Sequence, residues 1–335
     1  MKPPCVWFNK QLSNTWELMP LLAEARRAGE FRMVCSHPRL EVARRFDCDR
    51  QEREPARLGD DEYVRFCLDF ASRHGVRFFF PGHKVLPIVQ AAAHFEAIGT
   101  RVVASAKAST LALVRSKAKI YAALAGEPWI PDHTIVRDLS GFDAALKQLR
   151  ARHRIICCKP DTSVFGLGFH ILHDGETPVT SHDPALLIEL EAARRRLVER
   201  RSSRDLMLMQ YLPGPERSVD CLARGGELLR CVIRSKMNDG QMLEENPEIE
   251  SIVRQLTARF GLNNLFNVQF RDAGGRSYLL EINARMSGGL PFSCQSGFAF
   301  PLWAIRLALG KVTPEAMPYP RAGVWVPQTA AARSV

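Results

Sequence analysis

The amino-acid sequence predicts an α/β protein that begins with a small doubly wound parallel sheet and continues as an α+β fold. In the first third of the chain, short apolar strands alternate with helical segments, which is the pattern of a parallel sheet covered by helices. In the last third, two strand patterns flank a glycine-containing turn, which is typical of an antiparallel hairpin. With 335 residues, the chain is long enough for two or three domains.

The expected N-terminal domain covers residues 1–106 and alternates strands with helices. The predicted strands are 5–8, 31–35, 76–80 and 101–104, and the predicted helices are 12–28, 40–46, 61–74 and 85–98. No G-x-G-x-x-G follows the first strand, so this is not an ordinary dinucleotide site. Four residues follow predicted strand ends, where such sheets bind ligands. For each of them taken singly, an ordinary loop residue is the favoured interpretation. They are Asn9, Gly82, His83 and Lys84.

The rest of the chain is expected to form a smaller α+β part over residues 107–204 and a C-terminal part over 205–335. The further helices expected are 109–124, 142–152, 185–201, 247–260 and 301–309, and the further strands include 154–160, 206–212, 217–223 and 228–236. Lys159 ends one of these strands, and a lysine there is costly to bury unless an anion meets it. The next loop, with Ser163 and Gly166, can cradle phosphate through its backbone amides.

The predicted hairpin near residue 275 offers oxygen ligands at alternate positions. Glu281 and Asn283 lie two residues apart and therefore share one face of their strand. Gln269, on the preceding strand, joins them if the hairpin loop holds an odd number of residues, which we expect; an even number would turn it away. Carboxylate and amide oxygens suit Mg²⁺. The alternative is an edge strand with one solvated face.

Composition limits the classes of function. With 46% hydrophobic and 24% charged residues, the chain is typical of a soluble globular protein, without a membrane-spanning run or signal peptide. Nine cysteines without a C-x-x-C pair favour a reducing cytoplasm. The net charge of +10 is dispersed and not interleaved with aromatic residues, so nucleic acid is not expected. We assign the excess partly to a phosphate site and partly to solvated surface.

These motifs, in this order, resemble the ATP-grasp superfamily, and the hairpin is most similar to its carbamoyl-phosphate synthetase branch. The resemblance implies an ATP-grasp fold, in which two α+β subdomains grip ATP, preceded by a small Rossmann-like domain. The segment from Tyr211 to Glu216 is similar to the hinge that reads adenine and ribose. Residues 6–10 also resemble ATP-grasp proteins encoded in bacterial tellurium-resistance clusters. One departure is the loop after Lys159, which has fewer glycines than the usual lid.

The resemblance also assigns roles to residues. The metal ligands implied are Gln269, Glu281 and Asn283, which would hold two Mg²⁺ ions that Mn²⁺ can replace. The residues implied to bind ATP are Lys117, Lys159, Ser163, Gly166, Gln210, Tyr211, Leu212, Glu216 and Gln269. The catalytic residues implied are Arg285, Arg234 and Lys159, which would face the transferred phosphoryl group.

Plainer alternatives exist for three of these residues when each is taken singly. Lys117 lies between other basic residues and is also consistent with an exposed charge on a helix. Arg234 lies in a predicted strand, where it can simply pair with a carboxylate. Glu216 follows Gly-Pro and can be a turn residue, so only its place in the order of motifs favours a functional role.

The resemblance implies a cytoplasmic ATP-dependent carboxylate–amine ligase of small-molecule biosynthesis, which forms an amide through an acyl phosphate and releases ADP and phosphate. The absence of a convincing Ser, Cys or His constellation agrees, because phosphoryl transfer needs alignment and charge stabilisation above all. The alternatives are a ligase that tags a peptide or protein, a kinase, and a non-ligating nucleotide-binding or nucleic-acid-associated protein. The expected partners are ATP, a carboxylate and an amine, with no membrane, and a homodimer is a reasonable expectation.

Overall fold

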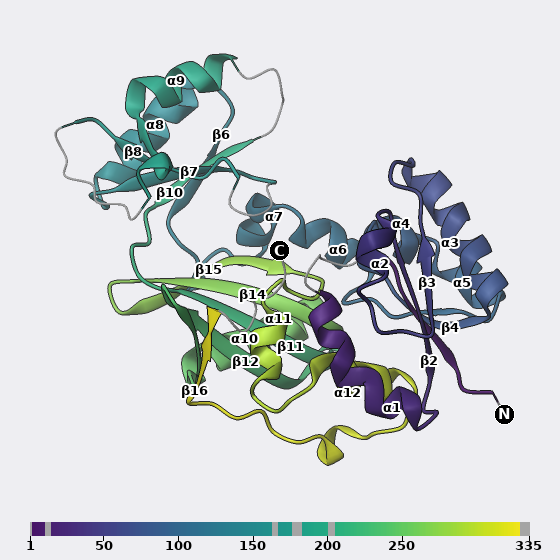
Figure 1. The fold of residues 1–335 in the computed structure, drawn as a ribbon. Coiled ribbons are helices and arrows are strands. Elements are labelled where there is room, and N and C mark those ends of the chain that lie inside the picture. Colours follow the sequence, from purple (N-terminus) through teal and green to yellow (C-terminus); the bar gives the residue numbers. More distant parts are fainter. Residues whose placement is uncertain (1, 11–14, 163–166, 176–182, 200–204, 329–335) are drawn as a thin grey trace. The chain divides into compact units, whose positions relative to one another are not determined.

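The computed structural model describes residues 2–10, 15–162, 167–175, 183–199 and 205–328. The chain divides into two compact units, whose elements are labelled in Figure 1. Unit 1 contains Met1–Ala112, Glu216–Gln269 and Ile282–Val335, and unit 2 contains Leu113–Pro215 and Phe270–Glu281. The division into three parts at residues 106 and 204 stays a prediction.

The N-terminal part of unit 1 is a five-stranded sheet of order β3-β2-β1-β4-β5, with every pair parallel. This confirms the predicted doubly wound sheet. Its strands are β1 (Cys5–Phe8), β2 (Arg32–His37), β3 (Arg50–Arg53), β4 (Val76–Phe80) and β5 (Arg101–Val102). Its helical segments are η1 (Thr15–Leu22), α1 (Ala23–Arg27), α2 (Leu40–Ala43), α3 (Asp60–His74), α4 (Val85–Gln90) and α5 (Ala92–Ala97).

The central strand β1 is buried along its whole length because the sheet is covered on both faces. Successive side chains of a strand point to opposite faces. Trp7 stacks on Phe70 of α3 and on Phe79 of β4, with ring centroids 4.3 and 4.0 Å apart. Val6 and Phe8 instead join a second core with residues of η1 and of the six-stranded sheet of unit 1.

That larger sheet has the order β15-β14-β11-β12-β13-β16. Its strands are β11 (Glu216–Arg224), β12 (Glu227–Lys236), β13 (Gly240–Glu244), β14 (Asn264–Ala273), β15 (Arg276–Asn283) and β16 (Val324–Pro327). The associated helical segments are α6 (Ala108–Val114), α10 (Pro247–Phe260), α11 (Leu290–Cys294), α12 (Phe300–Ala308) and η3 (Pro314–Ala316). Strands β14 and β15 pass through both units, since the boundaries fall after Gln269 and after Glu281.

Unit 2 is built on a mostly antiparallel sheet of order β6-β10-β7-β8-β9. Its strands are β6 (His133–Val136), β7 (Ile156–Pro160), β8 (His170–His173), β9 (Leu187–Glu189) and β10 (Leu206–Gln210). Its helical segments are α7 (Lys117–Ala123), α8 (Leu139–Arg150), η2 (Pro184–Leu186) and α9 (Leu190–Glu199). Helices α8 and α9 bury their apolar sides against this sheet.

Several predicted element boundaries were wrong. The helix expected over 12–28 is, within the described residues, the 3-10 segment η1 with Pro20 inside it, followed by the short α1; proline lacks the N–H that an α-helix interior needs. The helix expected over 185–201 begins only at Leu190, after η2 and β9. Strands β3, β8, β9, β13 and β16 were not predicted, because short or polar strands carry a weak periodic signal. No helix among the described residues has the length and apolar character needed to cross a membrane.

Candidate active site

The continuous helix expected over 109–124 is interrupted: α6 ends at Val114 and α7 begins at Lys117. Lys117 therefore lies at the first position of α7. Side-chain oxygens cap the first backbone amides of α7. Ser116 Oγ accepts from the Lys119 amide at 3.1 Å, and Asp161 accepts from the Ala118 amide at 2.6 Å and from the Ser116 hydroxyl at 2.7 Å. Because Asp161 directly follows the end of β7, these bonds tie the start of α7 to the end of β7.

The interpretation of Lys117 as an exposed helix charge is wrong. The residue is only 9% exposed, and its Nζ lies 3.1 Å from Oε2 of Glu281. Both residues belong to unit 2. The structure therefore brings together one predicted phosphate-binding lysine and one predicted metal ligand.

Lys159 lies near the end of β7 and is buried. Burial lowers the pKa of its ammonium to about 8; the nearby Cys157 and Glu281 oppose this shift, and Lys117 adds to it. Its Nζ lies 5.6 Å from the centroid of the Tyr121 ring, a cation–π distance. A buried ammonium with a lowered pKa is typical of a site that is completed by an anion.

Tyr121 connects these lysines to strand β15, and the sequence did not single it out. Its hydroxyl lies 2.7 Å from the carbonyl oxygen of Leu279 and 3.0 Å from that of Leu280. Burial, reinforced by the charge of Glu281, raises the pKa of Tyr121, so the hydroxyl stays protonated. Successive carbonyls of a regular strand point in opposite directions. A single hydroxyl that reaches both therefore marks an irregularity in β15 just before Glu281.

The prediction of an odd hairpin loop was wrong. Strand β14 ends at Ala273 and β15 begins at Arg276, so the loop contains the two residues Gly274 and Gly275. Their φ angles are +56° and +77°, and this pair of left-handed conformations forms the tight two-residue turns that suit hairpins. In a regular ladder this even loop would turn Gln269 away from Glu281. Because β15 is irregular, the length of the loop no longer determines whether Gln269 and Glu281 lie on the same face of the hairpin. The role of Gln269 stays a prediction.

The predicted adenine hinge follows β10 in unit 2. The Gln210 amide donates to the Asp132 carbonyl at 3.0 Å, and the Tyr211 amide donates to the Ile155 carbonyl at 3.0 Å. Among the described residues, the amide of the buried Leu212 donates to no protein acceptor. The hinge is thus fixed by two backbone bonds, and its third amide can serve a ligand.

Arg234 in unit 1 pairs with a carboxylate, as the plainer interpretation of the sequence expected. It is 1% exposed, and its guanidinium lies 3.0 Å from Oδ2 of Asp220. It also donates to Ser293 Oγ at 2.8 Å and to Ser287 Oγ at 3.2 Å, and it bonds the Gln241 side chain. Such a buried arginine costs energy to desolvate and is held by its full set of acceptors. Its catalytic role stays a prediction, and the contacts assign it the positioning of α11 and the loop before it.

The remaining predicted residues lie as follows. Glu216 begins β11 and forms an ion pair with Lys236. Asn283 ends β15, and Arg285 follows it and donates to the Met286 carbonyl at 3.0 Å. Ser163 and Gly166 lie outside the described residues.

The donor set fits a hard cation. No cluster of three or more His, Cys, Asp or Glu side chains occurs in the described parts of the chain, so a cage made of acidic residues alone is not found there. Mg²⁺ usually takes only one or two protein carboxylates and completes its shell with water and phosphate oxygens. One carboxylate, Glu281, with the amide of Asn283 two residues away on β15, agrees with this preference.

Known proteins resemble this chain in sequence and in fold. Residues 202–331 match the family model described as "ATP-grasp in the biosynthetic pathway with Ter operon". The carbamoyl phosphate synthase large chain of Clostridium perfringens is 24% identical over 186 residues, which are 51% of this chain and 16% of that protein. This chain therefore corresponds to a small part of that relative.

Solved structures share the fold over most of the chain. The biotin carboxylase domain of Hydrogenobacter thermophilus 2-oxoglutarate carboxylase, in complex with MgADP, ADP and bicarbonate, gives a TM-score of 0.67 at 17% identity, covering 93% of this chain and 71% of that one. N5-carboxyaminoimidazole synthetase from Staphylococcus aureus, complexed with ADP, gives 0.65 at 12% identity, covering 96% and 81%. L-amino acid ligase from Bacillus licheniformis gives 0.61 at 16% identity, covering 95% and 78%.

These comparisons confirm the prediction of the fold: the chain has the ATP-grasp fold. Its C-terminal part matches the group associated with the Ter operon, which confirms that resemblance through residues other than the N-terminal segment that suggested it. Carbamoyl phosphate synthase is among the relatives, in agreement with the resemblance of the hairpin.

Proposed function

We propose that this protein is an ATP-dependent ligase that joins a carboxylate to an amine through an acyl phosphate. The observation that carries the proposal is the cluster of Lys117, Lys159 and Glu281 within unit 2. Lys117 forms a 3.1 Å ion pair with Glu281, and Lys159 is a buried ammonium that lies within the electrostatic influence of both residues. On an ATP-grasp fold, such a cluster supports binding of nucleotide phosphates and a metal.

In this reaction a carboxylate oxygen attacks the γ-phosphorus of ATP, and the bond from that phosphorus to the bridging oxygen breaks, which releases ADP. The amine nitrogen then attacks the acyl carbon, loses a proton and displaces phosphate. Lys117 and Lys159 would neutralise the nucleotide phosphates, and the Leu212 amide would donate to adenine. Glu281, Asn283 and Gln269 would hold Mg²⁺, which supplies charge stabilisation to the transferred phosphoryl group when bound. Arg285 would face the same group.

The test is ADP release from Mg-ATP, screened against pooled carboxylates with and without pooled amines. We expect release that depends on both pools. Release with a carboxylate alone would indicate slow hydrolysis of the acyl phosphate and a missing nucleophile. Release that requires acidic peptides would favour a peptide-tagging ligase, for which the net charge of +10 is suited. ATP that does not bind at all would contradict the proposal.

A further inference from the structure

Two cysteines, Cys35 and Cys48, lie beside each other in the N-terminal part of unit 1. Cys35 belongs to β2, and Cys48 precedes β3, the strand that pairs with β2 in parallel. The Cys48 thiol donates to the carbonyl oxygen of Arg50 at 3.2 Å. Because Arg50 is in register with Val34, the residue before Cys35, the side chain of Cys48 reaches forward to the level of Cys35.

The two sulfurs lie on the same side of the sheet. Cys35 belongs to the core that contains Val6 and Phe8, and Cys48 packs against that core. The Cys48 sulfur is within hydrogen-bonding distance of both the thiol and the backbone of Cys35. Neighbouring strands lie about 4.8 Å apart, and disulfides join Cα atoms that are about 4.4–6.8 Å apart. Both cysteines are free thiols, and their placement suits a disulfide.

The surroundings of Cys48 favour its thiolate. The guanidinium of Arg26 binds Asp47 through Nη2 at 2.6 Å, whereas its Nη1 is buried and has no acceptor among the described residues. A hydrogen bond with Cys35, hydrogen bonds with the backbone and the charge of Arg26 lower the pKa of Cys48, against the effect of burial. Burial raises the pKa of Cys35, which stays a neutral thiol. A cysteine beside an arginine, with a lowered pKa, is typical of reactive thiols.

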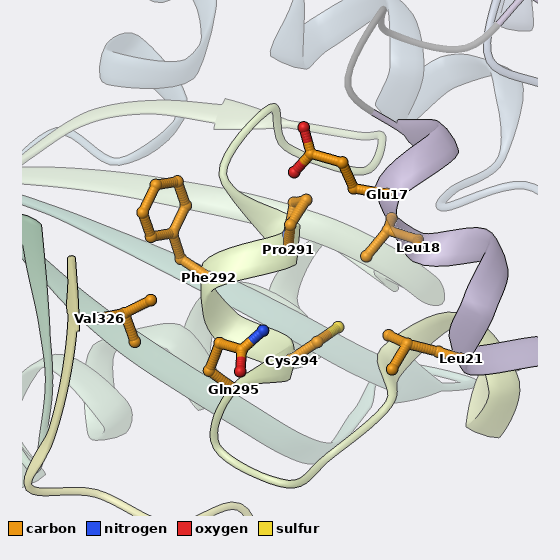
Figure 2. Close-up of a pocket in the computed structure, with 8 residues that line it drawn as sticks. All are labelled: Glu17, Leu18, Leu21, Pro291, Phe292, Cys294, Gln295 and Val326. Atoms are coloured by element: carbon orange, nitrogen blue, oxygen red, sulfur yellow. The ribbon is translucent and has the colours of Figure 1, made fainter. Parts of the chain in front are cut away.

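Other cysteines provide comparisons. Cys221 of β11 is directly opposite Cys231 of β12, so this pair is also close enough for a disulfide. Burial raises the pKa of both thiols, and that of Cys231 reaches about 12. Cys294 lines a cavity between η1 and α11 (Figure 2), and burial raises its pKa to about 12 as well. Neither a close partner nor a neighbouring cavity by itself gives a thiolate at neutral pH.

We propose that Cys48 is a site of oxidation by hydroperoxides and that Cys35 converts the product into a disulfide. The Cys48 thiolate attacks one peroxide oxygen, the O–O bond breaks, and a sulfenic acid and hydroxide form. The hydroxide takes up the proton that Cys48 released. The Cys35 sulfur then attacks the Cys48 sulfur, the S–O bond breaks, and the departing hydroxide takes the Cys35 proton. Two thiols lose two electrons, and hydrogen peroxide becomes two water molecules.

The test treats the reduced full chain with hydrogen peroxide near neutral pH, blocks the remaining thiols with N-ethylmaleimide and identifies linked peptides by mass spectrometry. We expect the disulfide between Cys35 and Cys48 to form at least about tenfold faster than oxidation of the other pair or of Cys294, because the thiolate is the reactive form. In Cys35→Ser, dimedone should label Cys48 as a sulfenic acid. Cys231→Ser, the matched change in the other pair, should leave the disulfide unaffected.

Arg26→Gln tests the electrostatic part of the proposal. Loss of the guanidinium charge should slow alkylation of Cys48 by iodoacetamide at least about threefold. Arg27→Gln, the same change at the next and exposed residue of α1, should leave this rate unchanged. Thermal unfolding of each variant shows that it is folded.

Three results would overturn the proposal. They are oxidation of Cys48 no faster than that of Cys231, a disulfide from Cys48 to a residue other than Cys35, and an unchanged rate of alkylation in Arg26→Gln. The readout is the chemistry of sulfur without ATP, so these results are separate from failure of the ligase reaction.

Discussion

At the scale of single residues, the pair of Lys117 and Glu281 is the most informative contact. The two side chains are only 11% and 25% exposed, so their charges are incompletely solvated and each benefits from the other. In the proposed function both would exchange partners when nucleotide binds: the lysine for a phosphate oxygen and the glutamate for a metal ion. The contact thus keeps two opposite charges beside each other in unit 2.

Glu281→Gln tests this assignment. The change keeps the shape of the side chain but removes the charge that would hold the metal, so we expect turnover to fall by roughly two to five decades. The loss of the ion pair should lower the melting temperature by only a few degrees. The matched control is Glu189→Gln, at the exposed last position of strand β9, which should leave both quantities unchanged. Normal turnover in Glu281→Gln would contradict the metal assignment.

Lys159 predicts a pH dependence of ATP binding. Its folded-state pKa is about 8, below the ordinary lysine value of about 10.4, so the ammonium loses its proton as pH rises through 8. Affinity for Mg-ATP should therefore fall above about pH 8, by up to about tenfold per pH unit. The folded protein binds fewer protons than the unfolded chain between these two pKa values, so this group makes stability rise with pH in that window.

Calorimetric titration of Mg-ATP between about pH 7 and about pH 9.5 measures this effect. Lys159→Arg serves as the control, because arginine keeps its charge throughout the range and should remove the pH dependence even if it weakens binding. A wild-type affinity that is constant across the range would show that Lys159 does not contact the nucleotide phosphates.

At the scale of elements, the loop between β15 and α11 contains Gly289, which leaves room for the guanidinium of Arg234. A Cβ at Gly289 would lie 2.3 Å from a guanidinium nitrogen of Arg234, and that guanidinium is held by a buried carboxylate and several other acceptors. Neither group can move freely. The close approach therefore requires glycine.

Gly289→Ala should accordingly lower the free energy of unfolding by about 1–3 kcal/mol, the usual cost of overpacking a rigid site. Urea unfolding measures this value. Gly59→Ala is the steric control, because a Cβ there would meet its nearest neighbour, Glu62, at an ordinary 3.5 Å. Gly59 is the N-cap of α3, where alanine is less favourable than glycine, so we expect a loss of at most about 1 kcal/mol. Equal effects of the two substitutions would contradict the role of Gly289.

The elements also show which parts of the site the sequence can predict. Lys159 was predicted because a charged residue at the end of an apolar strand conflicts with burial. The helix break before Lys117 was not, since the local cap, Ser116, is supported by Asp161, which is distant in sequence. The loop of the hairpin was predicted at the right place but with the wrong parity, because Gly274 and Gly275 can both adopt left-handed conformations. The network of Arg234 depends on pairing between strands that no local pattern specifies.

At the scale of the whole molecule, the N-terminal sheet and the ATP-grasp fold were predicted correctly from the order of strands, helices and motifs. The fold is shared with proteins at 12–17% identity, because the ordered set of elements persists where individual residues change. The two compact units were not predicted as such, since the boundaries cut through strands β14 and β15. Long-range contacts, which define such units, leave little trace in local sequence.

The central claim is that the reaction passes through an acyl phosphate. The most direct measurement supplies an active carboxylate with ¹⁸O in both oxygens, together with Mg-ATP and an active amine, and analyses the released phosphate by mass spectrometry. We predict that each phosphate carries one ¹⁸O, because the attacking carboxylate oxygen leaves with it. Phosphate without the label would show that water attacked ATP directly and would contradict the ligase mechanism.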